Sequence, residues 1–171
     1  QIARSSANLR KVSFTRITIL TYLVLTIASI LSLKLSGMGW FDAVTHGMSA
    51  CSTCGFSTRN ASIAAFDSPV AEAVLIVFML LASTRFVLLG RIFTKAGLRN
   101  LLKSDVTRCF YITFFAATAI ITINLISDGN YGHFGNCLRH AAYQVASLSS
   151  PTGYATTDTA AWPACAANMI P

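Results

Sequence analysis

Three long apolar segments, separated by shorter polar stretches, dominate the hydrophobic pattern of the chain. The first covers about residues 17–35, or about 28 Å as a helix, which is enough to cross the hydrocarbon core of a bilayer. The second begins at Ser68-Pro69, a typical helix-start signal, and runs to about residue 97. The third covers about residues 109–126. The pattern therefore predicts three membrane-spanning helices.

Two further apolar segments, about 41–52 and 137–149, are too short to cross a membrane. Segments of about 12 residues are typical of re-entrant or buried helices. Each precedes a polar motif built around a glycine: STCGFST at 52–58 and SPTGYAT at 150–156. The sequence thus predicts two short helices, each followed by a glycine loop.

The two motifs belong to an internal repeat. When Gly55 is aligned with Gly153, identical residues fall opposite each other on both sides of the glycines: Ala43 and Ala141, Ser49 and Ser147, Ser52 and Ser150, and Thr58 and Thr156. The repeating unit is a span, a short helix, a glycine loop and a second span. A repeat of this kind fixes the architecture, since each copy must fold in the same way.

Composition supports a membrane protein, because 54% of the residues are hydrophobic and only 11% are charged, with a mean hydropathy of +0.59. Soluble domains carry about 25% charged residues. The absence of an initiator Met and of a closing element predicts that the chain is an internal piece of a longer protein.

The net charge is +7, and most of the basic residues form two groups: Arg4, Arg10, Lys11 and Arg16, then Arg85, Arg91, Lys95, Arg99, Lys103 and Arg108. Basic loops stay in the cytoplasm, so we place residues 1–16 and 85–108 there and both glycine loops outside. Nucleic-acid surfaces interleave aromatic residues with basic ones. These groups lack that pattern, so nucleic acid is not an expected partner.

The glycine loops have the chemistry of a cation filter. Glycine reaches backbone angles that other residues avoid, so successive carbonyls can point toward one axis. Rings of such carbonyls replace the hydration shell of a cation. The preceding short helix would direct its partly negative C-terminus at the ion. Neither motif contains a carboxylate, so binding of the calcium-channel type is not predicted.

These segments resemble a known family. FDAVTHGMSACSTCGFSTRNASIAAF is similar to the second pore loop of the TrkH/KtrB (Trk/Ktr/HKT) potassium-uptake transporters, and AAYQVASLSSPTGYATTDTAAWP is similar to the third. FMLLASTRFVLLGR resembles the segment after the second pore loop. The resemblance implies an all-α membrane protein of the potassium-channel-like superfamily, with four M1–pore helix–filter loop–M2 repeats around one pore.

On this resemblance, residues 17–97 form a complete second repeat with its filter at 53–57 and its M2 helix at about 69–97. Residues 98–108 are a cytoplasmic linker, and 109–171 are a partial third repeat with its filter at 150–155 and no M2 helix. The implied filter residues are Thr53, Cys54, Gly55 and Phe56, and Pro151, Thr152, Gly153 and Tyr154. Cys54 stands where the family often has a second glycine, and Pro151 stands where it often has threonine.

The resemblance also implies a function. It predicts a pore-forming subunit, not an enzyme, that takes up potassium across the bacterial inner membrane, with potassium as the transported ion and no cofactor. The implied partners are membrane lipid, a second copy in a homodimer, and a cytoplasmic nucleotide-binding regulatory subunit of the TrkA/KtrA type. A sodium-permeable member of the same family is an alternative.

Two alternatives come from other classes of protein. A membrane metal or redox protein would use Cys51, Cys54, Cys137 and His140, but a single C-x-x-C is a weak signal and structural zinc takes four ligands. We therefore predict no zinc site, while Cys137 and Cys165 both lie outside the membrane and are candidates to pair. A purely structural membrane scaffold would leave the repeated glycine loops unexplained.

Three polar residues near the predicted membrane segments allow more than one interpretation. Arg85 either repels cations in the inner cavity or marks the cytoplasmic end of its helix. His46 and Gln144, aligned in the repeat, either respond to pH or supply hydrogen bonds behind a filter.

Overall fold

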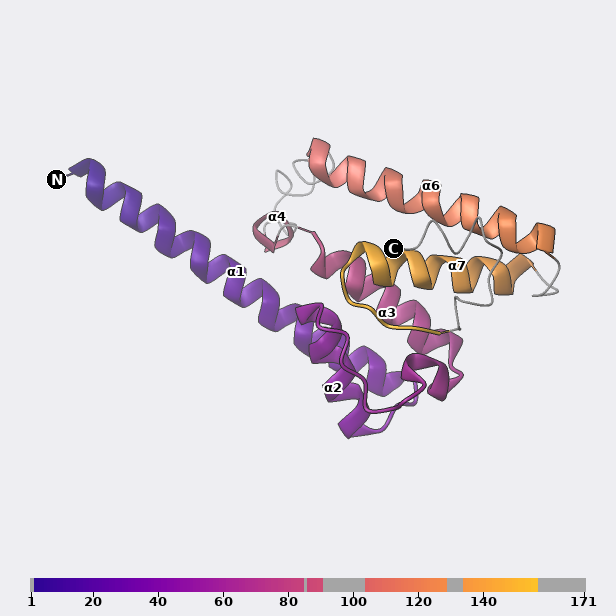
Figure 1. Cartoon of the computed structure of the whole chain (residues 1–171). Helices are drawn as coiled ribbons and strands as arrows, with labels where there is room; N and C mark the ends of the chain where they lie inside the picture. Colours follow the sequence, from indigo (N-terminus) through magenta and orange to yellow (C-terminus); the bar gives the residue numbers. More distant parts are fainter. Residues whose placement is uncertain (1, 85, 91–103, 129–133, 157–171) are drawn as a thin grey trace.

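The computed structural model describes residues 2–84, 86–90, 104–128 and 134–156, and these residues form helices and loops without a strand (Figure 1). The all-α fold predicted from the sequence is confirmed. Arg85, residues 91–97 of the predicted second span, and Cys165 lie outside the described residues.

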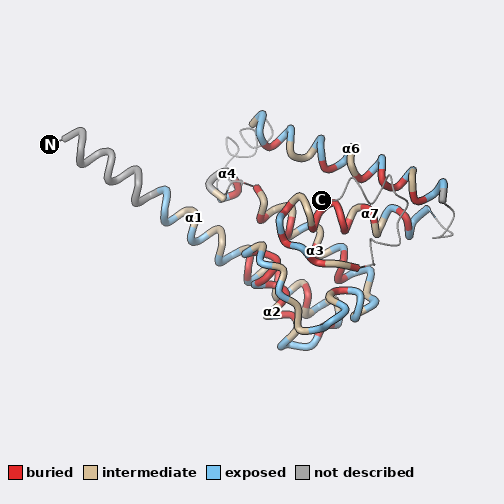
Figure 2. The backbone as a smooth tube through the Cα atoms, viewed as in Figure 1, coloured by how far each residue is buried: buried red, intermediate tan, exposed pale blue. Residues whose placement is uncertain are grey.

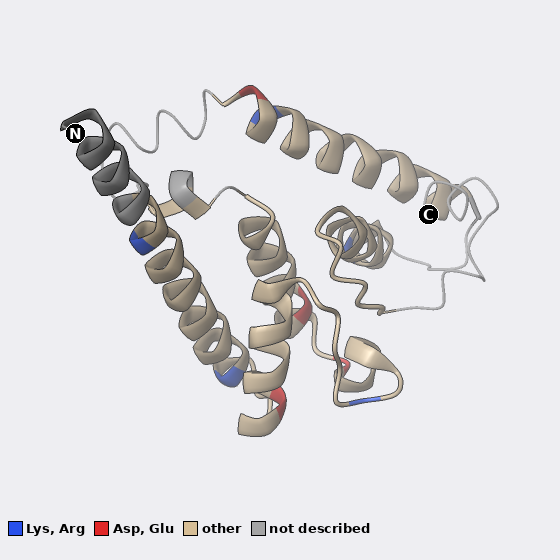
Figure 3. Cartoon of the chain, turned by 60° about the vertical axis from the view of Figure 1, so that its left-hand side comes forward, with Lys and Arg blue, Asp and Glu red and all other residues tan. Residues whose placement is uncertain are grey.

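Among the described residues, two helices are long and apolar enough to cross a membrane. Helix α1 (Ile2–Leu35) contains one candidate span, Phe14–Leu35, and helix α6 (Asp105–Asp128) contains the other, Asp105–Ser127. Only 17% and 28% of these segments are buried, unlike the core helix of a soluble protein. Within the two candidate spans, the charged residues lie toward the ends (Figure 3). Helix α1 begins well before residue 17, so residues 2–16 of the predicted N-terminal segment continue the span as helix.

Several threonine side chains within these spans form hydrogen bonds inside their own helix. The hydroxyl of Thr26 donates to the carbonyl of Tyr22 in α1, over 2.9 Å. In α6, Thr118 and Thr122 donate to the carbonyls four residues earlier, over 2.8 and 2.7 Å. Since a lipid interior offers no water to unpaired polar groups, this local bonding lets threonine occur in a spanning helix.

Helix α3 (Pro69–Ala82) begins where the sequence predicts it. The Ser68 hydroxyl accepts a hydrogen bond from the backbone N–H of Ala71, and Pro69 occupies the first helical position. The helix ends much earlier than residue 97. After Ser83 and Thr84 the chain continues as a separate short helix, α4 (Phe86–Gly90).

The interruption of the predicted second span has a local cause. The hydroxyls of Ser83 and Thr84 donate to the carbonyls of Met79 and Leu80, four residues earlier. The backbone N–H of Thr84 bonds to Leu81, only three residues earlier. Consecutive back-bonding hydroxyls and a tightened last turn weaken the regular helix ladder. The described apolar part of α3 is therefore shorter than a full span.

Two short helices occupy the segments where the sequence predicts them: α2 (Trp40–Ser52) and α7 (Phe134–Ser149). A single turn of 3₁₀ helix, η1 (Ser62–Phe66), follows the first glycine motif. In the packing, α1 contacts α2, α3 and α4, while α3 also contacts α2 and α7, and α6 lies along α7. Helix α3 therefore contacts the helices of both repeat units: α1 and α2 before it, and α7 after it.

The buried residues lie mainly where the short helices meet α3 (Figure 2). Leu75 and Met79 of α3, Ala43 and Ala50 of α2, and Ala141 of α7 are among the apolar residues of this core. Many large apolar side chains of α1 and α6 are exposed instead, as expected of surfaces that face lipid or other membrane helices.

Helix α2 contacts α1 closely at Gly47. A methyl group on Gly47 would lie 2.7 Å from Cγ1 of Ile30 and 3.0 Å from the backbone nitrogen of Ile30. Backbone atoms cannot move aside as a flexible side chain can, so only glycine permits this approach.

We expect Gly47→Ala to lower the free energy of unfolding by about 1–3 kcal/mol, the usual cost of overpacking, although alanine favours helices. Thermal unfolding of the purified full-length gene product in detergent measures this effect. Gly135→Ala in α7 is the matched control, because nothing lies within 4 Å of the added methyl group. Equal stability of the two variants would contradict the close helix contact.

Candidate functional site

The two short helices end in the same way. The backbone N–H of Cys54 bonds to the carbonyl of Ser49 over 3.1 Å, and that of Thr152 bonds to the carbonyl of Ser147 over 2.9 Å. These four residues are equivalent in the aligned repeat. Each loop is thus fastened to the last turn of its own helix, which supplies partners for backbone groups that a membrane interior would leave unpaired.

The backbone conformations of the two loops also match. Gly55 has φ 69° and Gly153 has φ 75°, both in the left-handed region that glycine adopts without strain. Thr53 is left-handed as well, with φ 53°. Pro151, opposite Thr53, has φ 29°, far from the value near −65° that its ring favours. The correspondence is therefore closest at the glycines.

The two glycine loops meet in the folded chain. A side chain on Gly55 would overlap the carbonyl oxygen of Thr152 and lie 3.2 Å from the Thr152 carbonyl carbon. Nearby, the backbone N–H of Ala155 donates to the hydroxyl of Ser62, over 3.4 Å. All eight predicted filter residues therefore lie in two loops that touch at their centres.

The loops differ in how far they are covered. Cys54 and Phe56 of the first loop are exposed, whereas Thr152 and Tyr154 of the second are buried. The Cys54 thiol donates to the Ser49 hydroxyl over 3.3 Å, so its side chain is turned toward its own helix. Cysteine at this position therefore still allows the loop to form.

A histidine lies behind the first loop. His46 of α2 is fully buried; its Nδ1 lies 2.8 Å from the carbonyl of Asp42, and its Nε2 lies 3.0 Å from the hydroxyl of Ser57. Because a carbonyl only accepts, Nδ1 carries the proton and Nε2 of the neutral ring accepts from Ser57. His46 thus connects the helix to its own loop. Gln144, aligned with His46, is also buried.

Asp42, which no sequence motif marks, binds the segment that follows the first glycine loop. The hydroxyl of Thr58 donates to Asp42 over 2.6 Å, and the guanidinium of Arg59 lies 3.6 Å from the same carboxylate. The hydrogen bond from Thr58 is the largest influence and lowers the pKa of Asp42, against an opposing effect of burial. The only sequence signal for this link is the presence of a carboxylate and a cation 17 positions apart, which is too common to interpret.

A partly buried ion pair joins α3 to α7. Nε of Arg139 lies 3.2 Å from the carboxylate of Glu72, and the two side chains are 28% and 4% exposed. Glu72 lies in α3, after the first glycine loop, whereas Arg139 lies in α7, before the second. No sequence pattern indicated this contact, because its partners are distant along the chain.

The cysteines and His140 do not form a metal centre in the part of the chain that the structure describes, since no group of three or more His, Cys, Asp or Glu side chains comes together there. Cys51 and Cys137 are buried, and Cys54 is exposed. The proposed Cys137–Cys165 pair stays a prediction.

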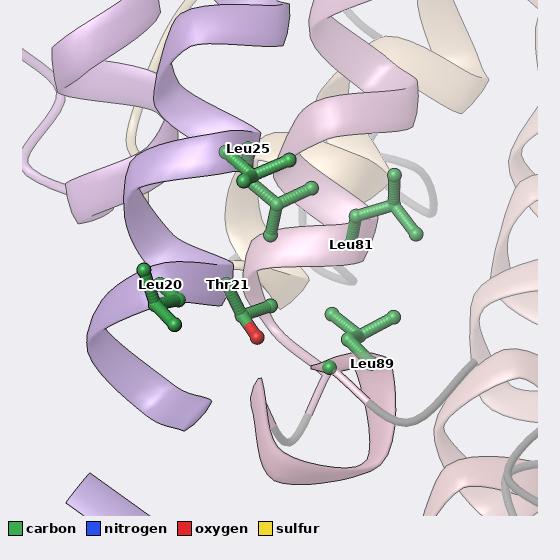
Figure 4. A pocket seen from close by; sticks show the side chains of 7 residues that line it. Leu20, Thr21, Leu25, Leu81 and Leu89 are labelled. Carbon is green, nitrogen blue, oxygen red and sulfur yellow. The ribbon is translucent and has the colours of Figure 1, made fainter. Parts of the chain in front are cut away.

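A cavity of 290 Å³ lies between α1, α3 and α4, away from the glycine loops (Figure 4). Leu20, Thr21 and Leu25 line it from α1, together with Leu81 and Leu89. The Thr21 hydroxyl already donates to the carbonyl of Ile17, over 2.7 Å. The other described side chains that line the cavity are apolar, so it offers one hydroxyl oxygen and not the ring of oxygen ligands seen in cation filters.

Fold and site together define a helical membrane protein in which two short helices, α2 and α7, are each followed by a glycine loop, and the two loops are in contact. Comparison with known proteins identifies the family: the chain belongs to the TrkH family of cation transport proteins, whose pattern matches residues 4–169.

Individual relatives agree with this assignment. The chain is 33% identical over 143 residues to the Trk system potassium uptake protein TrkH of Halomonas elongata, covering 83% of this chain and 29% of that protein. It is 31% identical over 144 residues to TrkH of Escherichia coli K12, covering 84% and 30%. The chain thus spans less than a third of these curated relatives.

A solved structure shows the same arrangement. The crystal structure of the potassium transporter TrkH from Vibrio parahaemolyticus superposes with a TM-score of 0.77 at 29% identity, over 95% of this chain and 33% of that one. The predicted family and the helical membrane fold are therefore confirmed.

The different surroundings of Gly55 and Gly153 predict different losses of stability when each is replaced by alanine. Alanine at either position adopts a left-handed conformation at a cost of about 1–2 kcal/mol. Gly153 has open space around it, whereas Gly55 abuts the Thr152 carbonyl. We therefore expect Gly55→Ala to lower the thermal stability of the full-length gene product clearly more than Gly153→Ala does. Equal losses would mean that the loops do not touch at Gly55.

The ion pair between α3 and α7 makes a further prediction. Arg139→Gln leaves the buried carboxylate of Glu72 without its cation, which costs about 3–5 kcal/mol when such a charge cannot reach water. Arg59→Gln is the matched control, because Arg59 is 57% exposed and exposed pairs contribute only about 0–1 kcal/mol. Chemical denaturation compares the variants, and a larger loss for Arg59→Gln would contradict this prediction.

Proposed function

We propose that this chain forms two neighbouring walls of a potassium-selective filter in a bacterial inner-membrane uptake system. The observation that supports this proposal is the contact between two matching glycine loops, in which the backbone at Gly55 abuts the carbonyl of Thr152. Two equivalent loops that meet at their glycines are the arrangement expected of adjacent walls around one ion path.

The loops would act on the ion through backbone carbonyls. A potassium ion that enters the filter loses water, and carbonyl oxygens replace that hydration shell. The carbonyl ends of α2 and α7 carry partial negative charge, which favours a cation in front of both loops. Neither loop offers a carboxylate. An ion held by dipoles alone leaves again readily, which transport requires.

The residues proposed to supply these ligands are those of the two touching loops: Thr53, Cys54, Gly55 and Phe56 in the first, and Pro151, Thr152, Gly153 and Tyr154 in the second. Within the second loop, the buried hydroxyls of Ser150 and Thr152 lie 2.6 Å apart. They stabilise the shape of the loop, because they hydrogen-bond to each other away from water.

The remaining features of the proposal concern the whole protein. Both relatives above are potassium uptake proteins by name, which supports transport of potassium by this chain's parent. The basic segments 1–16 and 85–108 would lie in the cytoplasm. A homodimer with lipid around it and a cytoplasmic nucleotide-binding subunit of the TrkA/KtrA type completes the proposed assembly.

The test uses bacteria that lack their own potassium uptake and express the full-length gene product. We expect growth at low potassium, and we expect Gly55→Ser and Gly153→Ser to lower the ratio of potassium to sodium uptake by roughly tenfold, equivalent to about 1.4 kcal/mol. A serine at either position strains the left-handed conformation of the loop, which glycine adopts freely.

Gly135→Ser is the control, because Gly135 has open space and lies outside both loops. Unchanged selectivity in both filter variants would refute the filter assignment. Wild-type protein that carries sodium as well as potassium would instead identify the sodium-permeable alternative, and bound metal in the purified protein would support the metal or redox alternative.

A further inference from the structure

Tyr154 extends from the second glycine loop into the first repeat unit. Its hydroxyl donates to the carbonyl of Phe56 over 3.1 Å and lies 3.4 Å from the carbonyl of His46. The side chain is only 1% exposed. Its ring lies beside the imidazole of His46, with ring centroids 5.7 Å apart. A residue of one loop thus contacts both the helix and the loop of the other repeat.

The peptide group between Phe56 and Ser57 is held from two sides. Tyr154 binds its carbonyl oxygen, and His46 binds the side chain of Ser57 through Nε2. His46 is itself fixed, because its Nδ1 donates to the carbonyl of Asp42. Because the neighbouring Gly55 has no side chain to restrict its torsions, these two contacts help to fix the orientation of this peptide.

The backbone of Tyr154 is also anchored. The buried hydroxyl of Ser147 in α7 donates to the Tyr154 carbonyl over 2.7 Å. The hydroxyl that contacts Phe56 is therefore carried by a residue whose main chain is fastened to its own short helix. The tyrosine links the end of α7 to the first loop as one continuous set of bonds.

The hydrogen bond from Tyr154 to the first loop has no equivalent from the first loop to the second. Phe56 occupies the position equivalent to Tyr154, but it lacks a hydroxyl and its side chain is 63% exposed. The first loop therefore cannot return the same bond. The second loop supplies the donor, and the first loop supplies the carbonyl whose orientation depends on it.

We propose that Tyr154 is a positioning residue for the neighbouring filter wall: its hydroxyl fixes the Phe56–Ser57 peptide, so the ion selectivity of residues 53–57 depends on a residue of the next repeat. The proposal rests on the filter function proposed above. A carbonyl oxygen has two lone pairs, so the bond from Tyr154 leaves one free. A wall whose carbonyls shift discriminates less between potassium and the smaller sodium ion.

The test is Tyr154→Phe in the full-length gene product, which removes a single oxygen atom. We expect the ratio of potassium to sodium uptake in the uptake-deficient cells to fall roughly three- to tenfold, the range that loss of one hydrogen bond gives. The amount of protein in the membrane should stay near that of the wild type.

Tyr143→Phe is the matched control. Tyr143 of α7 is as deeply buried as Tyr154, but its hydroxyl has no hydrogen-bond partner among the described residues. We expect its selectivity to equal that of the wild type. A loss shared equally by both variants would overturn the proposal, because it would show a general effect of buried tyrosine hydroxyls.

Ser57→Ala tests the same peptide from the other side and serves if Tyr154→Phe does not reach the membrane. It removes the contact with His46, and we expect a smaller loss of selectivity in the same direction. Wild-type selectivity in Tyr154→Phe, or in Ser57→Ala where that variant replaces it, would refute the positioning role. If Gly55→Ser still lowered selectivity, the filter itself would stand; if it did not, the proposed function would fail as well.

Discussion

The backbone of Gly55 abuts the carbonyl oxygen of Thr152, and no side chain fits between them. Several other features of the structure depend on this contact. Helices α2 and α7 must end close together, so both pack against α3, and Arg139 of α7 pairs with Glu72 of α3. Tyr154 reaches the carbonyl of Phe56 only because the loops already touch. A close approach of two main chains thus organises two repeat units into one site.

The surroundings of this contact follow from the low polarity of a membrane interior. Loop N–H groups bond back to Ser49 and Ser147 at the ends of the short helices, and threonines within the spans bond to carbonyls one turn earlier. The buried carboxylate of Glu72 has a cation beside it. Polar groups are costly here unless they are paired, so the site is built from backbone and hydroxyl groups that satisfy each other.

Local patterns predicted the elements well and their limits less well. Ser68-Pro69 marked the start of α3 because capping depends on neighbouring residues alone. The end of that helix was missed, because Ser83 and Thr84 oppose an otherwise apolar helical pattern through bonds to their own backbone. The Glu72–Arg139 pair and the role of Tyr154 were also missed. Each joins residues far apart in the chain, and no periodicity records which of many charged or aromatic residues will meet.

By itself, the sequence determined the class of this protein: apolar segments of spanning length, a repeated short helix with its glycine motif, and basic residues grouped on one predicted side. These properties are local or additive, so they can be counted along the chain. Only the tertiary structure decided that the two motifs touch, that Gly55 rather than Gly153 is closely confined, and that the hydroxyl of Tyr154 serves the other loop. Those outcomes depend on the relative placement of α2, α3 and α7, which is set by packing among distant residues.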